Sequence, residues 1–260
     1  MNRRRRLLIA LGAGALTPLA SRAQQSPAKV PRIAFLGNST AALEANLVGP
    51  FRAGLRDLGY VEGRNIVLEY RWAEGNYDRL PELIAELIAL KVDVIVTAGT
   101  PAALAVKRAT TTIPLVMVAV GDPVGTGLVA SLAEPGGSAT GLTSIAPDLE
   151  GKRLELLMEV VPKVSYVSFL VNPSNAFHVA SEKQARAAAK QLHLNVQFIP
   201  VRADSEFDRA FDTIIRERPG ALVVLADRVF LHNRARIVDF AARNHLQPCI
   251  HTWSWSKEEA

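Results

Sequence analysis

From residue 30 onward, short apolar runs alternate with segments in which apolar residues recur every three or four positions. The run Arg32–Gly37 is of the first kind, and Leu43, Leu47 and Phe51 in the segment after it share one face of a helix. Runs that are apolar throughout, rather than at every second residue, are typical of parallel strands covered on both faces. The alternation therefore predicts an α/β fold in which helices pack on both sides of parallel sheets.

The same periodicity divides the rest of the chain into predicted elements. Strands are expected at residues 32–37, 66–72, 93–97, 114–120, 167–171, 196–201, 221–225 and from 248 onward. Helices are expected at 43–58, 80–88, 101–109, 180–191, 207–215 and 237–241, with Asp78 as a candidate N-cap of the second.

The second half of the chain repeats the pattern of the first. Phe35-Leu36-Gly37-Asn38 corresponds to Phe169-Leu170-Val171-Asn172, and later strands correspond at nearly the same separation along the chain. A repeat of this length predicts two similar doubly wound (Rossmann-like) lobes, lobe 1 at residues 30–143 and lobe 2 at 144–250. The small residues at 136–141, between the two lobes, predict a hinge.

The first 23 residues read as an export signal. Arg3–Arg6 form a basic start, residues 7–20 are apolar, and Ser21-Arg22-Ala23 has small residues where a signal peptidase cleaves. We therefore expect a signal peptide at 1–23 that is cleaved after Ala23, with an uncleaved anchor as the alternative. The arginine pair followed by Leu7-Leu8 also resembles a twin-arginine signal, so the Sec and Tat routes both stay open.

Charge and cysteine content exclude several classes of protein. The formal net charge of +5 is carried by the five arginines of residues 1–23, so the remaining chain is neutral and nucleic-acid binding is not expected. The single cysteine, Cys249, excludes an intrachain disulfide and is expected to be a small core residue.

Signatures of enzymes, cofactors and metals are missing from the sequence. There is no GxxxxGK[ST] phosphate loop, no GxSxG elbow and no dinucleotide fingerprint after a strand. The five histidines have no metal-ligand spacing, and several of them are expected at the surface. We expect neither enzymatic activity nor a cofactor nor a metal.

In open parallel sheets, ligands bind beyond the carboxyl ends of the strands, so residues that follow strands are the candidates. Ala98-Gly99-Thr100 precedes Pro101, and the N–H groups of such a helix start attract a carboxylate. Thr100 is equally a plain N-cap. Asp122, before Pro123, is expected mainly to cap a following helix and could also bind a ligand donor.

Lobe 2 and the first strand supply further candidates. Asn172 begins a polar turn after a strand, where it could reach a cleft or simply form the turn. Asp227 follows an apolar strand, and burying it requires a partner, which could be a ligand ammonium or Arg228. Asn38 and Ser39 hold the matching place in lobe 1. An anion site on one lobe and a carboxylate on the other would suit a zwitterion.

Several sequence stretches together resemble one known family. They are residues 21–25, 51–66 (FRAGLRDLGYVEGRNI), 69–75 (EYRWAEG), 99–103 (GTPAA), 122–125 (DPVG), 134–137 (EPGG) and 172–173 (NP). The chain resembles the substrate-binding proteins of ABC transporters that include the tryptophan-binding TrpX type. The resemblance covers nearly the whole chain.

This resemblance implies a type I periplasmic-binding fold that closes about a hinge on a small molecule, an amino acid and often an aromatic one. It implies a periplasmic protein that works with an ABC permease in the inner membrane, and we expect a monomer. By position, the residues facing the cleft would be Asn38, Ser39, Ala98, Gly99, Thr100, Asp122, Ser144, Asn172 and Asp227. Gly99 and Thr100 would hold the ligand carboxylate and Asp227 its ammonium.

The chain departs from the family at its C-terminal end. Family members continue past the segment that matches Ser256–Ala260, so we expect residues 251–260 to start a truncated return crossing to lobe 1 and leave apolar surface exposed there. Three other readings stay open: a sensor domain that presents its closed form to a receptor, a secreted enzyme on the same fold, and a truncated product without function.

Overall fold

The computed structural model describes residues 29–144 and 149–250, and for residues 247–250 only the main chain. The predicted signal peptide and the predicted return crossing at 251–260 lie outside the described residues. The expectation that Cys249 is a core residue falls on a side chain that is also outside this description.

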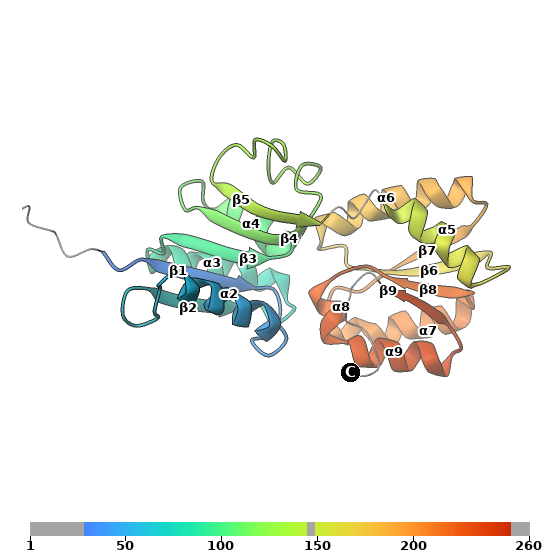
Figure 1. Cartoon of the computed structure of the whole chain (residues 1–260). Coiled ribbons are helices and arrows are strands. Elements are labelled where there is room, and N and C mark those ends of the chain that lie inside the picture. The colour runs from blue at the N-terminus through green and yellow to red at the C-terminus, as the bar shows by residue number, and fades with distance from the viewer. Residues whose placement is uncertain (1–28, 145–148, 251–260) are drawn as a thin grey trace, which may run out of the picture. The chain divides into compact units, whose positions relative to one another are not determined.

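The first sheet is built from parallel strands with helices beside it (Figure 1). Within the described residues its order is β2-β1-β3-β4-β5, and each neighbouring pair is parallel. The strands are β1 (Arg32–Gly37), β2 (Val67–Trp72), β3 (Val94–Ala98), β4 (Leu115–Gly121) and β5 (Ala139–Ser144). The helices are α2 (Ala45–Asp57), the short 3₁₀ helix η1 (Tyr77–Arg79), α3 (Leu80–Ala89) and α4 (Thr100–Ala109).

The second sheet repeats this order, as β7-β6-β8-β9 in the described part of the chain, and is also parallel. Its strands are β6 (Tyr166–Val171), β7 (Asn195–Pro200), β8 (Ala221–Val224) and β9 (Gln247–Ile250). Its helices are α5 (Glu150–Val160), α6 (Ala176–Gln191), the 3₁₀ helix η3 (Asp204–Glu206), α7 (Phe207–Glu217), α8 (Arg228–His232) and α9 (Arg234–Arg243). The shared strand order confirms the α/β fold with two doubly wound lobes.

Each sheet is covered by apolar side chains, as the unbroken apolar strands predict. In the first sheet, Leu83, Ile84 and Leu87 of α3 pack with Leu36 and Ile95 of the strands. In the second, one face carries a core around α7 and α9, and the other carries a core around α5 and α6. Residues on alternate positions of β6 point to these two cores: Leu170 to one, Val167 and Phe169 to the other.

Part of the segment expected to be the hinge, residues 136–141, belongs to a strand. Residues 139–141 lie inside β5, where Ala139, Thr140 and Gly141 pair with β4. The periodicity did not predict this strand because its sequence, ATGLTS, is mostly polar and its Leu142 is exposed. The short helix α8 and the helix α5 were also not predicted.

Asp78 is not the N-cap of α3. Asn76 takes the capping role for η1, since its side chain accepts a hydrogen bond from the Asp78 N–H at 3.1 Å. The chain then continues through Arg79 into α3 without a side-chain cap. An Asx-type cap two residues before the predicted position starts the helical segment earlier than the apolar pattern indicates.

Helix α2 is held less tightly than its apolar stripe indicates. None of its residues is fully buried in the described structure, although Phe51 packs against Phe35 with ring centroids 5.9 Å apart. Leu58, directly after the helix, is 77% exposed. Apolar surface is therefore open to solvent on this side of lobe 1.

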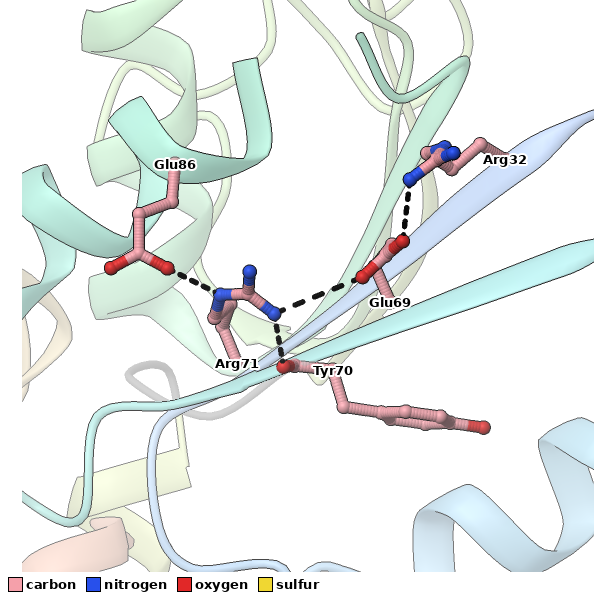
Figure 2. A network of polar contacts seen from close by, with 5 residues as sticks. All are labelled: Arg32, Glu69, Tyr70, Arg71 and Glu86. Carbon is pink, nitrogen blue, oxygen red and sulfur yellow. Dashed lines mark hydrogen bonds and ion pairs between the residues drawn. The ribbon is translucent and has the colours of Figure 1, made fainter. Parts of the chain in front are cut away.

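A network of charges joins β1, β2 and α3 (Figure 2). Arg71 reaches Glu86 at 2.6 Å and Glu69 at 3.9 Å, and Arg32 binds the other oxygen of Glu69 at 2.6 Å. Arg71 also donates to the carbonyl of Tyr70. Because these side chains are partly exposed, each pair contributes only about 0–1 kcal/mol. The charged side chains on β2, the outer strand of this sheet, disfavour its pairing with a strand of another molecule.

Gly141 gives a test of how β5 is held. Its φ is +142°, and a Cβ at this position would overlap the carbonyl of Met117 on β4. We expect Gly141→Ala to lower the free energy of unfolding by roughly 2–4 kcal/mol in chemical denaturation, because the methyl group forces β5 away from β4.

Gly54 provides the matched control. It lies in α2, and a Cβ added to it would have no atom within 4 Å, so Gly54→Ala is the same chemical change in open space. This variant should stabilise the protein by up to about 1 kcal/mol. Equal effects of the two substitutions would contradict the close approach of β4 and β5.

Candidate functional site

A cavity of about 410 Å³ lies where the strands of both sheets end and the following helices begin. Its wall combines residues of lobe 1 and lobe 2 with mixed apolar and polar character. The lining residues are Asn38, Tyr77, Gly99, Thr100, Pro101, Ala119, Gly121, Ser144, Leu149, Arg153, Asn175, Phe177, Ala226, Asp227, Arg228 and Leu231.

The end of β1 brings unpartnered polar atoms to the lobe 1 side of the cavity. The Asn38 amide nitrogen donates to the carbonyl of Ala98, which leaves Asn38 Oδ1 without a partner among the described residues. Ser39 Oγ and Glu44 Oε2 are likewise buried and unpartnered within the described structure. Buried polar atoms are nearly always bonded, so such a cluster calls for a donor from water or a ligand.

Glu44 anchors this loop and was missed by the sequence analysis. Its Oε1 accepts a hydrogen bond from the Ser39 N–H at 2.7 Å, and the side chain is fully buried. Burial raises the pKa of the Glu44 carboxyl, while attraction to Arg228 and hydrogen bonds from the Ser39 and Asn38 main chain act in the opposite direction. An acid just before a helix was the available signal, but its burial depends on tertiary contacts.

Gly99 and Thr100 form the turn from β3 into α4, but the N-cap residue is Gly99 and not Thr100. Gly99, with φ +95°, is the N-cap residue, and α4 begins at Thr100 itself. Thr100 Oγ1 accepts a hydrogen bond from the Gly121 N–H at 3.1 Å, so it ties α4 to the end of β4 instead of capping its own helix. The glycine allows this because a positive φ turns the strand directly into the helix.

Gly121 and Phe177 meet at the cavity wall. A Cβ on Gly121 would overlap the Phe177 ring, so glycine lets this ring from α6 lie against the end of β4. The residues on either side of this stretch, Ala119 and Asp122, have φ values of +52° and +42°. Backbone strain of this kind, about 1–3 kcal/mol per residue, collects at sites where the chain is held by its surroundings.

Asp227 is satisfied by neutral donors. Its Oδ1 accepts hydrogen bonds from the Val229 N–H at 2.9 Å, the Tyr77 hydroxyl at 2.9 Å and the Asn172 amide at 3.3 Å. Its Oδ2 accepts one from the Asn175 amide at 2.9 Å. These neutral groups take the place that Arg228 was expected to fill if no ligand did. Asp227 caps α8, and Oδ2 keeps room for a further donor.

The side chain of Tyr77, on η1 of lobe 1, donates a hydrogen bond to Asp227 of lobe 2. Burial raises the pKa of the Tyr77 hydroxyl well above its usual value of 10.0, and the charge of Asp227 raises it further. The hydroxyl therefore stays protonated and donates to Asp227. This bond joins the two lobes beside the cavity.

Two arginines supply positive charge to the cavity, and the sequence analysis did not select either as a ligand-binding residue. Arg153 on α5 forms an ion pair with the buried Glu150 at 3.0 Å. Arg228, at the start of α8, has no ion-pair partner within the described part of the chain, although it attracts Glu44. The only signal for Arg228 in the sequence was its position directly after Asp227.

The structure brings some predicted site residues together and separates others. Asn38, Gly99, Thr100, Ser144 and Asp227 line the cavity. Ala98 contributes the carbonyl that binds Asn38, Ser39 is buried beside Glu44, and Asn172 is buried behind Asp227. None of these three is among the lining residues that the structure describes.

Asp122 lies elsewhere. It lines a neighbouring groove with Lys183 and Val179 of α6, and its Oδ1 accepts a hydrogen bond from the Gly125 N–H at 2.8 Å. A turn follows it rather than a helix, so its expected role as a helix cap is wrong. The Pro123-to-Gly127 segment has too many glycines to continue as a helix.

Several histidines lie at the surface as expected, namely His193, His232 and His245, whereas His178 is only 1% exposed. In the described residues, no group of three or more His, Cys, Asp or Glu side chains is placed to hold a metal ion. No helix of that part of the chain has the length and apolar character needed to cross a membrane.

The raised pKa of Glu44 predicts how stability depends on pH. Because ionisation is harder in the folded protein than in the unfolded chain, the contribution of Glu44 to the free energy of unfolding is greatest below 4.5, the ordinary value, and falls as pH rises through the raised pKa. Glu44→Gln keeps an oxygen to accept from Ser39 and removes the charge. We expect its stability relative to wild type to improve as pH rises across that window, measured by denaturation between about pH 4 and about pH 8.

Glu155→Gln is the control, since Glu155 is an exposed residue of α5 paired with Lys152. Its stability should follow the wild-type pH profile in the same window. If Glu44→Gln and wild type changed in parallel with pH, the buried carboxylate would not be ionising as described.

Comparison with known proteins places the chain in a family. The model of the family described as ABC transporter substrate binding protein matches residues 39–251. A tyrosine-binding protein of Clostridioides difficile strain R20291 is 31% identical over 165 residues, which are 64% of this chain. The match spans 47% of that protein, about half the length of this curated relative.

Solved structures share the fold. A conserved domain protein from Vibrio cholerae O1 biovar El Tor superposes with a TM-score of 0.78 at 27% identity, covering 87% of this chain and 76% of its own. An ABC domain in complex with L-Trp from Streptococcus pneumonia superposes with a TM-score of 0.77 at 22% identity, covering 86% and 75%. With the family match over most of its length, the chain belongs to the ABC transporter substrate-binding proteins and has their type I periplasmic-binding fold.

Proposed function

We propose that this chain is the periplasmic solute-binding component of an ABC importer and that it captures an amino acid, of the aromatic kind, in the cavity between its lobes. The observation that carries the proposal is that a positively charged group and an unpartnered hydrogen-bond acceptor line the same cavity. Arg228 offers a guanidinium without an ion-pair partner in the described structure, and Asn38 Oδ1 is an acceptor without a donor there.

A zwitterion would satisfy both kinds of group. Its carboxylate would bind the Arg228 guanidinium and the Thr100 N–H at the start of α4, since the Gly99 N–H already donates to the Val118 carbonyl at 2.9 Å. Its ammonium would donate to Asp227 Oδ2 and to Asn38 Oδ1. Each assignment uses a polar atom whose bonding capacity is not exhausted by the contacts described above.

The rest of the wall favours an apolar side chain of moderate size. Phe177, Leu149 and Leu231 contribute apolar surface, and a cavity of about 410 Å³ falls in the range of small-molecule sites, roughly 300–1,000 Å³. The relative from Clostridioides difficile is named for tyrosine, which supports an aromatic amino acid.

In this proposal, capture works by hinge closure. Lobe 1 (residues 30–143) and lobe 2 (144–250) close on the ligand, and the closed form is recognised by a permease in the inner membrane. Residues 1–23 would direct export to the periplasm, where the protein would act as a monomer. Ligand groups held by both lobes at once favour the closed form over the open one.

The test is thermal and chemical unfolding of the purified protein with a panel of amino acids, sugars and small acids. We expect L-tyrosine, L-tryptophan or L-phenylalanine to raise the midpoint, because a ligand that binds only the folded state stabilises it by about 2.7 kcal/mol at a hundred times its Kd. Stabilisation by sugars alone, or turnover of a stabilising compound, would oppose the proposal.

Substitution of Arg228 tests the assigned carboxylate partner. Arg228→Met removes the charge but keeps an unbranched side chain, and should weaken amino-acid binding by about ten-fold or more in calorimetry. Arg243→Met, in the last turn of α9 and outside the cavity lining, should bind like wild type. Equal affinities of the two variants would remove Arg228 from the site.

A further inference from the structure

His178, in the first turn of α6, is a buried polar ring that the proposed function does not use. Its ring stacks against Phe230 with centroids 5.9 Å apart and meets the edge of Phe177 at 5.7 Å. A polar ring that is 1% exposed needs hydrogen bonds on its nitrogens to offset the loss of water.

Both nitrogens have main-chain partners. Nδ1 lies 2.7 Å from the main-chain nitrogen of Asn172, and Nε2 lies 3.0 Å from the carbonyl oxygen of Ala226. An N–H only donates and a carbonyl only accepts, so Nδ1 must be the acceptor and Nε2 must carry the proton. The contacts therefore fix the neutral ring in a single tautomer.

These two partners belong to the loops that follow neighbouring strands. Asn172 comes directly after β6, and Ala226 follows β8 by two residues; the paired register of these strands ends at Leu170 and Val224. Beyond that point the sheet no longer sets the distance between the two chains. The imidazole connects the two loops just beyond the last paired residues of β6 and β8.

The same two loops contribute residues to the lobe 2 wall of the cavity. Asn175 lies on the first loop, and Ala226, Asp227 and Arg228 lie on the second. The side chains of Asn172 and Asn175 also donate to Asp227, so a change in loop spacing would alter the position of its carboxylate.

We propose that His178 is a positioning residue for ligand binding: as a neutral imidazole between Asn172 and Ala226, it sets the spacing of the two loops that present Asp227 and Arg228 to the ligand. The binding part of this inference rests on the proposed function, whereas the tautomer and the loop contacts do not.

Two substitutions of His178 distinguish the effect of ring size on ligand binding from the effect of the ring's hydrogen bonds. His178→Phe keeps a ring of similar size but leaves the Asn172 N–H and the Ala226 carbonyl without their partner. His178→Gln offers an amide oxygen to accept and an amide NH2 group to donate. We expect His178→Phe to weaken L-tyrosine binding by about ten-fold or more in calorimetry, and His178→Gln to recover most of the wild-type affinity.

Phe240→Leu is the matched control. Phe240 stacks on Phe211 in the lobe 2 core, 4.0 Å between centroids, and does not line the cavity. This variant should lower the melting temperature and leave the affinity of the folded protein unchanged. A general loss of packing in lobe 2 would move stability in both variants, but only a positioning role moves affinity in His178→Phe alone.

Acidification tests the same contact without a mutation. A proton on Nδ1 would face the Asn172 N–H, so wild-type affinity should fall as His178 is protonated, and His178→Gln should lack this fall. In the described part of the chain, the charged and titratable groups on the elements around the ring are the same in both proteins: Glu182, Lys183, Arg186 and Lys190 on α6, Asp227 and Arg228 after β8, His232 on α8, and Tyr77 against Asp227.

Nuclear magnetic resonance decides the geometry independently of any ligand. Long-range nitrogen–proton spectra of the wild type at neutral pH should show His178 protonated at Nε2 only, and the Asn172 amide should exchange faster in His178→Phe than in Phe240→Leu. If the wild type does not bind L-tyrosine but these results hold, the proposed ligand is wrong and the loop spacing by His178 stands.

Two results would overturn the inference. One is a spectrum with the proton on Nδ1 or on both nitrogens at neutral pH. The other is a folded His178→Phe variant that binds the amino acid as tightly as wild type.

Discussion

Where a parallel strand ends inside a protein, its last N–H and C=O groups lose their partners in the sheet while still buried, and side chains must replace them. The cavity of this protein is surrounded by such replacements. Asn38 binds the carbonyl of Ala98, Thr100 binds the main chain of Gly121, and His178 joins Asn172 to Ala226. Groups on the cavity wall are therefore held by the same contacts that complete the ends of the strands.

The two walls meet this constraint in different ways. In lobe 2, neutral neighbours hold Asp227 and His178 in place, while Asp227 Oδ2 and the Arg228 guanidinium keep further bonding capacity toward the cavity. In lobe 1, Asn38, Ser39 and Glu44 keep buried oxygens without partners in the described structure. The charged groups of lobe 2 are thus held in position by hydrogen bonds, whereas the lobe 1 loop and Glu44 behind it keep buried atoms without a partner in the described structure.

The sequence predicted the fold well because the buried strands are long apolar runs and the helices carry clear stripes. It failed where those signals are weak: β5 is mostly polar, and α8 has a single turn fixed by the Asp227 cap. For the site, placing candidates after strands found Asn38, Gly99, Thr100 and Asp227 on the cavity wall, and the family resemblance added Ser144. Glu44, Arg153 and His178 could not be found this way, because their burial and partners come from segments distant in the chain.

The loose packing of α2 has a consequence for motion in lobe 1. Glu44 is the residue directly before this helix, and it is also the anchor of the Asn38–Ser39 loop. Because no residue of α2 is fully buried in the described structure, local unfolding of this helix costs little compared with opening the sheets. Glu44 itself is fully buried and accepts from the Ser39 N–H, so the Asn38–Ser39 loop keeps its anchor when the helix after it opens.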